Sequence, residues 1–261
     1  MPTLRVIRNK GKSQVSHFIK FFVSLCFPVL LSLPIPTEAR EVSIKVISHN
    51  LERYLNNRDT SELEKLVSKE ISISLKKEYQ DFLKKFPNAK WTITPGEKLK
   101  GNRESINLYI TAKKEMGVQK YSLEAKQKLA ISHKNNRIIK KETLSESSVL
   151  QSIDSPLEVT INIPDVVLTG AKYDIDIVLE KPLKEAIIAA GLISMSSPKT
   201  GSQLMPNIQL APMGSGGLFK STQAPLKPGI QRWAALIAHP DGLISITKMV
   251  RVVSKSSEMA P

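Results

Sequence analysis

The first residues to test for chemistry are histidines that stand close to carboxylates in the chain. Glu52 follows His49 by three residues, and Asp241 follows His239 by two. A zinc site needs three or four such side chains, and no second histidine is near either pair. One helical turn and one hairpin explain the two spacings. The sequence therefore predicts no metal site and no bound cofactor.

Nucleophilic catalysis has little more support. The chain has no Gly-x-Ser-x-Gly elbow for a catalytic serine, and its one cysteine, Cys26, lies in a segment that we expect to be removed. The Gly-rich stretch from Gly214 to Gly217 lacks the lysine and the strand–loop–helix context of a phosphate-binding loop. The sequence favours a protein without catalytic activity over an enzyme.

The remaining feature that could serve a function is the excess of positive charge. The chain has 38 basic and 24 acidic side chains, a formal net charge of +14. Lysines at alternate positions of expected strands can dock an acidic protein, an anionic membrane surface or another polyanion, or they can be ordinary solvating charge. Nucleic acid is disfavoured, because no aromatic residues are interleaved with the lysines and export is expected. The candidate docking residues are Lys113, Lys120, Lys126, Lys128 and Arg137.

Export is expected from the N-terminal segment. An apolar run over residues 21–33 follows a basic leader, and Thr37 and Ala39 form a small-residue cleavage motif before Arg40. A membrane-spanning helix needs about 20 apolar residues, and prolines interrupt this run. A lipid-modified Cys26 would need a small residue before it, where Leu25 stands. An uncleaved anchor and a lipoprotein are the alternatives to a cleaved signal peptide over residues 1–39.

Cleavage between Ala39 and Arg40 leaves a product without cysteine, and hence without disulfides or thiolate-bound metal. A disulfide-free exported protein suits the periplasm or a thylakoid lumen. No later apolar run approaches membrane-spanning length, so we expect no integral membrane protein after processing. Most of the excess positive charge lies in residues 40–152, and the composition changes near residue 152. We expect domains over residues 40–152 and 153–254, and a disordered tail over residues 255–261.

The first domain is expected to begin with three helices. Apolar residues recur at steps of three and four from Ile44 to Leu55, which predicts a helix. Asp59 and Glu62 have the spacing of a capping box at the start of a second helix. A third helix is expected to be capped by Ser72 or Ser74 and to end before Pro87.

Period-two alternation follows over residues 106–113 and 121–131. With the runs at residues 89–94 before and 137–144 after, it predicts about four antiparallel strands with one apolar face for the helices to cover. Tight turns are expected at Met116-Gly117 and at Asn135-Asn136, and the asparagines are suited to positive φ. Helices followed by such a meander resemble the nuclear-transport-factor-like, cystatin-type α+β cone, over residues 42–150.

This resemblance implies either an enzyme of the isomerase or dehydratase type or a non-catalytic binding module. Enzymes of the family place an Asp/His acid–base group, often with a Tyr donor, inside the cone. Here the polar residues expected on the inner face are Gln119, Tyr121 and Gln127, and Tyr54 of the first helix can point in as well. His133 points inward too but lies at the rim. Tyr54, Tyr121 and Gln127 are the candidate ligand contacts if the cone holds a small molecule.

The second domain is predicted to be all strand and turn. Short β-branched runs are bounded by Pro and Gly, and His239-Pro-Asp-Gly242 has the residues of a hairpin turn. Strands at this spacing resemble an immunoglobulin-like β-sandwich over residues 153–254. Taken whole, the chain resembles exported proteins of marine cyanobacteria, a resemblance that implies no particular function.

These observations predict a non-enzymatic binding or assembly factor that docks a protein or an anionic surface. The alternative is a small-molecule carrier, or an isomerase- or dehydratase-type enzyme, that uses the interior of the cone. A cavity above roughly 300 Å³ with convergent polar groups favours this alternative. An interior filled by apolar side chains favours the binding factor.

Overall fold

The computed structural model describes residues 44–101, 103–181, 188–195, 208–213, 216–240 and 242–260, so the expected signal peptide and its cleavage site at Ala39 and Arg40 lie outside the described residues. Helices α1 (Ile44–Asn57), α2 (Thr60–Leu66) and α3 (Lys69–Lys85) come first. Asp59 caps α2 by accepting a hydrogen bond from the backbone N–H of Glu62 at 3.0 Å, as predicted. Helix α3 starts earlier than predicted, with Ser68 at its N-cap in place of Ser72 or Ser74.

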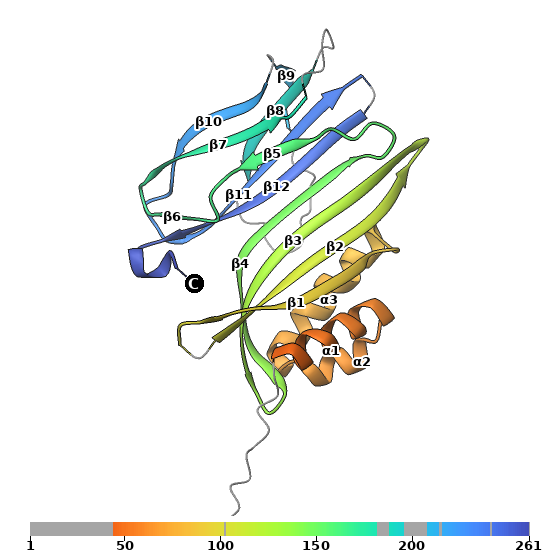
Figure 1. The fold of residues 1–261 in the computed structure, drawn as a ribbon, viewed down its shortest axis with the longest axis vertical. Helices are drawn as coiled ribbons and strands as arrows, with labels where there is room; N and C mark the ends of the chain where they lie inside the picture. The colour runs from red at the N-terminus through yellow and green to blue at the C-terminus, as the bar shows by residue number, and fades with distance from the viewer. Residues whose placement is uncertain are drawn as a thin grey trace, which may run out of the picture. The chain divides into compact units, whose positions relative to one another are not determined.

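The rest of the described chain is almost entirely strand. The strands are β1 (Lys90–Leu99), β2 (Arg103–Met116), β3 (Gln119–Lys134), β4 (Arg137–Ser152), β5 (Val159–Asn162), β6 (Val166–Leu168), β7 (Lys172–Leu179), β8 (Ala189–Met195), β9 (Ala211–Pro212), β10 (Gly217–Gln223), β11 (Gly229–His239) and β12 (Gly242–Val253). Among the described residues they form one nine-stranded sheet in the order β1-β2-β3-β4-β12-β11-β8-β9, where β6 also pairs with β12, and one three-stranded sheet in the order β10-β7-β5 (Figure 1). The expected tail includes a 3-10 turn, η1 (Ser256–Glu258).

The expected fold class, an α+β domain followed by a separate immunoglobulin-like sandwich, is wrong. Strand β4 continues beyond the helices and pairs with β12, from Ser147 opposite Lys248 to Gln151 opposite Ile244. One sheet therefore runs through both halves, and the described residues belong to one compact unit, Glu41–Pro261. Alternation in a sequence shows which face of a strand is buried, but it does not show which strand is the neighbour. This is why the pairing was missed.

The predicted turns are confirmed. Asn135 and Asn136 have φ of 49° and 64°, and Gly117 has φ of 63°. These positive values fit the right-handed twist of a two-stranded hairpin. His239 pairs with Gly242 across the hairpin between β11 and β12. The local turn chemistry thus sets the β2–β3 and β3–β4 hairpins, and the β11–β12 hairpin lies where the sequence predicts it.

The two faces of the nine-stranded sheet are covered in different places. Helices α1–α3 lie against β1–β4 (Figure 1), and their apolar side chains form one core with residues such as Ile106 and Leu129. The three-stranded sheet forms a second core with β8, β11 and β12, which includes Ile177 and Ile246. Ile246 pairs with Val149 of β4, and Val149 pairs with Glu124 of β3, so these three side chains lie on one face of the sheet. Leu129 is an odd number of residues away from Glu124 along β3, so its side chain points to the opposite face. The helices and the small sheet therefore cover opposite faces.

Tyr173 is the polar anchor of the second core. Its hydroxyl accepts a hydrogen bond from Nε1 of Trp233 at 2.8 Å and donates one to Oε1 of Gln231 at 2.8 Å. Burial raises the pKa of Tyr173 above the ordinary 10.0, although the bond from Trp233 acts in the other direction. The folded state therefore holds this proton more tightly than the unfolded state.

The raised pKa of Tyr173 couples its ionisation to folding and predicts a loss of stability at alkaline pH. The stabilisation from Tyr173 is fully present below the ordinary tyrosine pKa and is lost as pH rises through the higher folded-state pKa. Urea unfolding at a series of pH values from about 9 upward should show a smaller alkaline loss for Tyr173→Phe than for the wild type. Tyr54→Phe controls for removal of a hydroxyl. An equal alkaline loss in the wild type and in Tyr173→Phe would contradict the argument.

The contact between β4 and β12 predicts an energetic coupling across the two halves. A Cβ added at Gly242 would lie 2.3 Å from Oγ and 2.6 Å from Cβ of Ser152. Gly242→Ala should therefore destabilise the protein by about 1–3 kcal/mol. Ser152→Gly should recover part of this loss, with a coupling free energy of about 0.5 kcal/mol or more in a double-mutant cycle. Additive effects of the two changes would mean that β4 and β12 do not pack as described.

Candidate binding groove

The predicted lysines lie on one face of the nine-stranded sheet. The side chains of four lysines point to the same face of the sheet as Glu124, which is the face opposite the helices. They are Lys113 of β2 and Lys120, Lys126 and Lys128 of β3. We call these four residues and the sheet surface that carries them the lysine face. It is continuous with the face that the three-stranded sheet covers over β12.

Most of this charge is unpaired. Lys113, Lys120 and Lys126 are exposed and take part in no ion pair within the described part of the chain. Lys128 pairs with Glu97 at 2.5 Å, and the Glu97 side chain is 58% exposed. An exposed pair of this kind stabilises a fold by at most about 1 kcal/mol. The fold therefore makes little use of the lysine face.

Arg137 is not part of this surface in the structure. Its guanidinium donates hydrogen bonds at 2.9 and 3.2 Å to the carbonyl oxygen of Val67, and one at 3.4 Å to that of Glu64. These carbonyls lie at the end of α2, where a helix leaves acceptors without partners. Arg137 caps the helix, and the structure does not bring it together with the four lysines.

A groove opens where the lysine face meets the three-stranded sheet. Its cavity volume is about 380 Å³, within the size range of ligand pockets. The floor comes from β3, β4 and β12, and the apolar wall comes from β5 and the residues before it. The residues that line it are Glu124, Lys126, Ser147, Ser148, Val149, Gln151, Leu157, Val159, Ile161 and Lys248.

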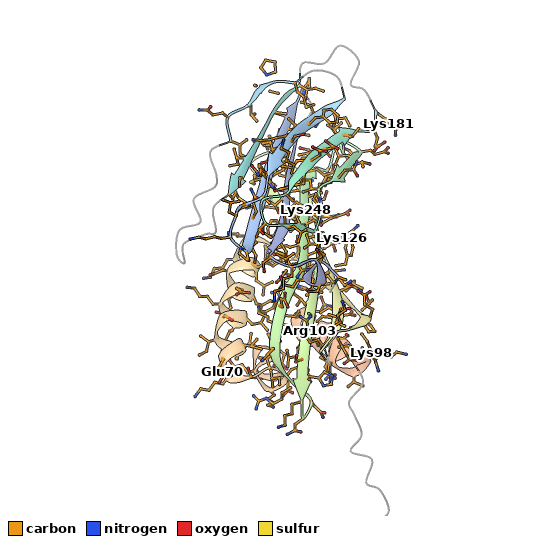
Figure 2. All side chains as sticks on the ribbon, turned by 90° about the vertical axis from the view of Figure 1, so that its left-hand side faces the viewer. Glu70, Lys98, Arg103, Lys126, Lys181 and Lys248 are labelled. Carbon is orange, nitrogen blue, oxygen red and sulfur yellow. The ribbon has the colours of Figure 1, made fainter. Side chains whose placement is uncertain are left out.

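A row of two cations and a hydroxyl crosses the floor of this groove. Ser147 pairs with Lys126 on one side and with Lys248 on the other. Adjacent strands are about 4.8 Å apart, so the two lysines flank the serine on the same face. Figure 2 labels both lysines, which lie close together near the middle of the molecule in that view. Such a row can bind a carboxylate by charge and by hydrogen bonding.

Carboxylates already present at the groove are partly engaged. Asp165 pairs with Lys248 at 2.5 Å, and the Lys248 side chain is 15% exposed. Glu124 lies beside Tyr109, and burial together with the hydrogen bond to Glu124 raises the pKa of that phenol. Lys126 has no carboxylate partner among the described residues, so it is the cation most available to an incoming anion.

Sequence reasoning found Lys126 but missed Lys248, Asp165 and the wall formed by β5. A signal for Lys248 was present in the sequence. Its side chain points to the same face of β12 as Ile244, Ile246 and Val250, which are fully buried. A lysine at an otherwise apolar position of a strand is rarely buried without a partner. The identity of that partner, Asp165, depends on the tertiary fold.

The three candidate ligand contacts of the cone do not converge. Tyr54 lies on α1, where its hydroxyl accepts a hydrogen bond from Arg53 at 3.1 Å. Tyr121 is buried and hydrogen-bonds to Gln119, which is on the same strand. Gln127 donates to Glu146 at 3.4 Å, and six residues of strand, about 20 Å, separate it from Tyr121. Tyr121 and Gln127 are therefore too far apart to contact one small ligand.

An apolar core lies between the helices and the sheet. A cavity of about 420 Å³ is lined by Ile71 of α3 together with Arg103, Ala130, Ser132, Lys140, Lys141 and Glu142 of the strands. The core residues are Ile47, Leu51, Leu55, Leu63, Leu66, Val67, Tyr79, Trp91, Ile93, Ile106, Leu108, Leu129, Ile131 and Ile138. A smaller cavity of about 180 Å³, which Tyr54 lines, is formed by α1, α2 and Asn136. Tyr54 is the one of the three predicted ligand contacts that lines this smaller cavity, and neither Tyr121 nor Gln127 lines it.

His133 has a carboxylate partner that the sequence did not reveal. Its Nε2 lies 2.8 Å from Oε2 of Glu104, and the two side chains are 18% and 21% exposed. Glu104 and His133 have the parity of the helix-covered face, and the pair forms because β2 and β3 are hydrogen-bonded neighbours. A His–Glu pair can act as a general base. The described residues hold no group of three His, Cys, Asp or Glu side chains that could bind a metal ion.

Comparison with known proteins gives one family match. Residues 154–253 are similar to a family described as a domain of unknown function, DUF8623. The match begins just after β4 ends and extends to the last residue of β12. No curated protein matches the chain. Among the described residues, no helix is both long and apolar enough to cross a membrane.

The exposure of the lysine face predicts that its charge is dispensable for folding. Lys113, Lys120, Lys126 and Lys128, changed together to Gln, should shift the free energy of unfolding by no more than about 1 kcal/mol. The measurement is urea unfolding of the wild type and the quadruple variant in the same buffer. A larger loss would show that these lysines support the fold, for example through the pair with Glu97.

Proposed function

We propose that this protein is a binding or assembly factor without catalytic activity, and that it docks an acidic partner protein along the lysine face and in the groove. The observation that carries the proposal is the cationic row of Lys126, Ser147 and Lys248, because it lies on the floor of the groove and adjoins unpaired lysines. Clustered charge of one sign steers an oppositely charged partner and raises the rate of association.

A protein partner fits this surface better than a lipid bilayer. The cationic row lies at the bottom of a groove whose wall is formed by Leu157, Val159 and Ile161. A segment of polypeptide can enter such a groove and contact both the wall and the floor. A flat bilayer would reach only the outer lysines, such as Lys113 and Lys120.

The proposal includes export. The basic leader, the short apolar run and the cleavage motif before Arg40 support a cleaved signal peptide, and with it a place in the periplasm or a thylakoid lumen. The carrier or enzyme alternative has less support, since Tyr54, Tyr121 and Gln127 do not line a common cavity and an apolar core lies between the helices and the sheet. The resemblance to the nuclear-transport-factor-like cone stays a prediction.

The proposal predicts salt-dependent binding of an acidic polypeptide. Fluorescent poly-glutamate should bind the full chain at about 0.05 M salt and much more weakly at about 0.5 M, where the Debye length falls to a few ångströms. The quadruple Gln variant of Lys113, Lys120, Lys126 and Lys128 should bind at least about tenfold more weakly at the lower salt concentration, since it lacks most of the cationic surface.

A matched control separates position from net charge. Lys69, Lys77, Lys98 and Lys227 are exposed lysines outside the lysine face, and their joint change to Gln removes the same charge. This control variant should bind poly-glutamate almost as the wild type does. Equal losses in both variants would reduce the effect to net charge and contradict the proposal. Stronger binding to phosphatidylglycerol vesicles than to poly-glutamate would make the partner a membrane surface instead.

A further inference from the structure

Strand β5 has a free edge at the groove. In the described chain it pairs only with β7, as the outer strand of the three-stranded sheet. The backbone N–H of Glu180 donates to the carbonyl of Glu158 at 3.0 Å, which fixes the phase of the ladder. In an antiparallel pair, alternate residues direct their backbone groups toward the neighbouring strand. Thr160 therefore faces β7, whereas Val159 and Ile161 direct their N–H and C=O groups to the open edge.

The same two residues also line the groove with their side chains. Val159 and Ile161 form the apolar wall together with Leu157, and the floor opposite them carries Lys126 and Lys248. The groove thus combines a row of unpaired backbone groups, an apolar wall and two cations. An extended polypeptide can satisfy all three at once, because its backbone bonds sideways while its alternate side chains point down.

Three other sheet edges of the described chain are less suited to an added strand. Strand β10, the other edge of the three-stranded sheet, carries Lys220. Strand β1 contains Pro95, and its register with β2 shifts between Pro95 and Lys98. The part of β4 that extends beyond β12 has two register shifts against β3, and it carries Lys140 and Lys141. Proline, irregular register and lysine are among the features that protect edges from pairing, and shortness of the strand is another. Strand β5 has none of these three, and its shortness alone limits the length of any added ladder.

We infer that β5 accepts an extended acidic segment of the partner as an added β-strand, an inference that rests on the proposed function. The side chains of the segment that face the floor are acidic and meet the row of Lys126, Ser147 and Lys248. Glu124, two residues from Lys126 along β3, disfavours a carboxylate at its own position, so it helps to set the register. Asp165 competes for Lys248 and so weakens the binding of acidic segments.

The test uses the full chain and short labelled peptides in which Glu and Thr alternate. Two further peptides carry backbone N-methyl groups, one on all Glu residues and the other on all Thr residues. Only one of these two sets can donate to β5, because alternate amides of a strand point to opposite edges. One methylated peptide should therefore bind at least about tenfold more weakly than the parent, and the other nearly as the parent does.

Protein variants test the floor of the groove. Lys126→Gln combined with Lys248→Gln should weaken binding of the parent peptide severalfold, and Asp165→Asn should strengthen it, because Lys248 is released. Lys98→Gln is the control, since Lys98 lies well away from the groove (Figure 2). Hydrogen exchange gives a structural readout. The bound peptide should slow exchange of the Val159 and Ile161 amides, whereas the Thr160 amide already bonds to β7 and should change little.

The outcomes separate the two proposals. If the parent peptide binds through the lysines and both methylated peptides bind equally well, then strand addition is overturned and the acidic docking surface stands. If poly-glutamate binds but the alternating peptide does not, then strand addition is again overturned. If neither acidic probe binds, then both proposals fall. Selective loss with one methylated peptide, together with protection of Val159 and Ile161, supports the added strand.

Discussion

The pairing of β4 with β12 is the interaction on which the rest of the structure depends. It joins a helix-covered meander to a strand that belongs to the second core, over five residue pairs from Ser147–Lys248 to Gln151–Ile244. Side chains support the ladder on both faces. Ser148 and Thr247 are hydrogen-bonded at 2.7 Å, and Val149 packs against the core of the three-stranded sheet. Neither half has a complete sheet without the other.

The groove is a direct result of this continuity. The helices cover one face of the sheet over β1–β4, and the small sheet covers the other face over β8, β11 and β12. The face that is buried under β5 and β7 emerges over β3, and there it carries Lys126 beside Ser147. Two separate domains would have placed Lys126 and Lys248 on unrelated surfaces. The continuous sheet makes them cross-strand neighbours of the same serine.

Much of the local structure was predictable from the sequence. Period 3.6 from Ile44 to Leu55 and period two over residues 106–113 and 121–131 gave the order of helices and strands, and Asn135-Asn136 gave a turn. These signals depend on neighbours in the chain, so one sequence is enough to detect them. The parity of Lys113, Lys120, Lys126 and Lys128 placed them together on one face for the same reason.

What could not be predicted depends on contacts between distant residues. Nothing local to Ser147 indicates that its neighbour is Lys248, about 100 residues later. The role of Arg137 as a cap for α2 required the structure, because Val67 lies 70 residues before it. The pair of Glu104 with His133 depends on the register of β2 against β3, which the sequence does not reveal, although both side chains point to the helix-covered face. Predicting such contacts requires the register between neighbouring strands as well as the alternation of side chains along each strand.

The boundary of the family match has a consequence for other chains. The matched segment, residues 154–253, contains β12 but not β4, which covers the outer edge of β12 over Ile244–Lys248. In a polypeptide that carries this segment alone, residues 244–248 of β12 would form an open sheet edge, next to fully buried residues such as Ile246. An open edge exposes unpaired backbone groups and is usually covered, shortened or protected by charge. In this protein, β4 of the preceding meander covers that edge.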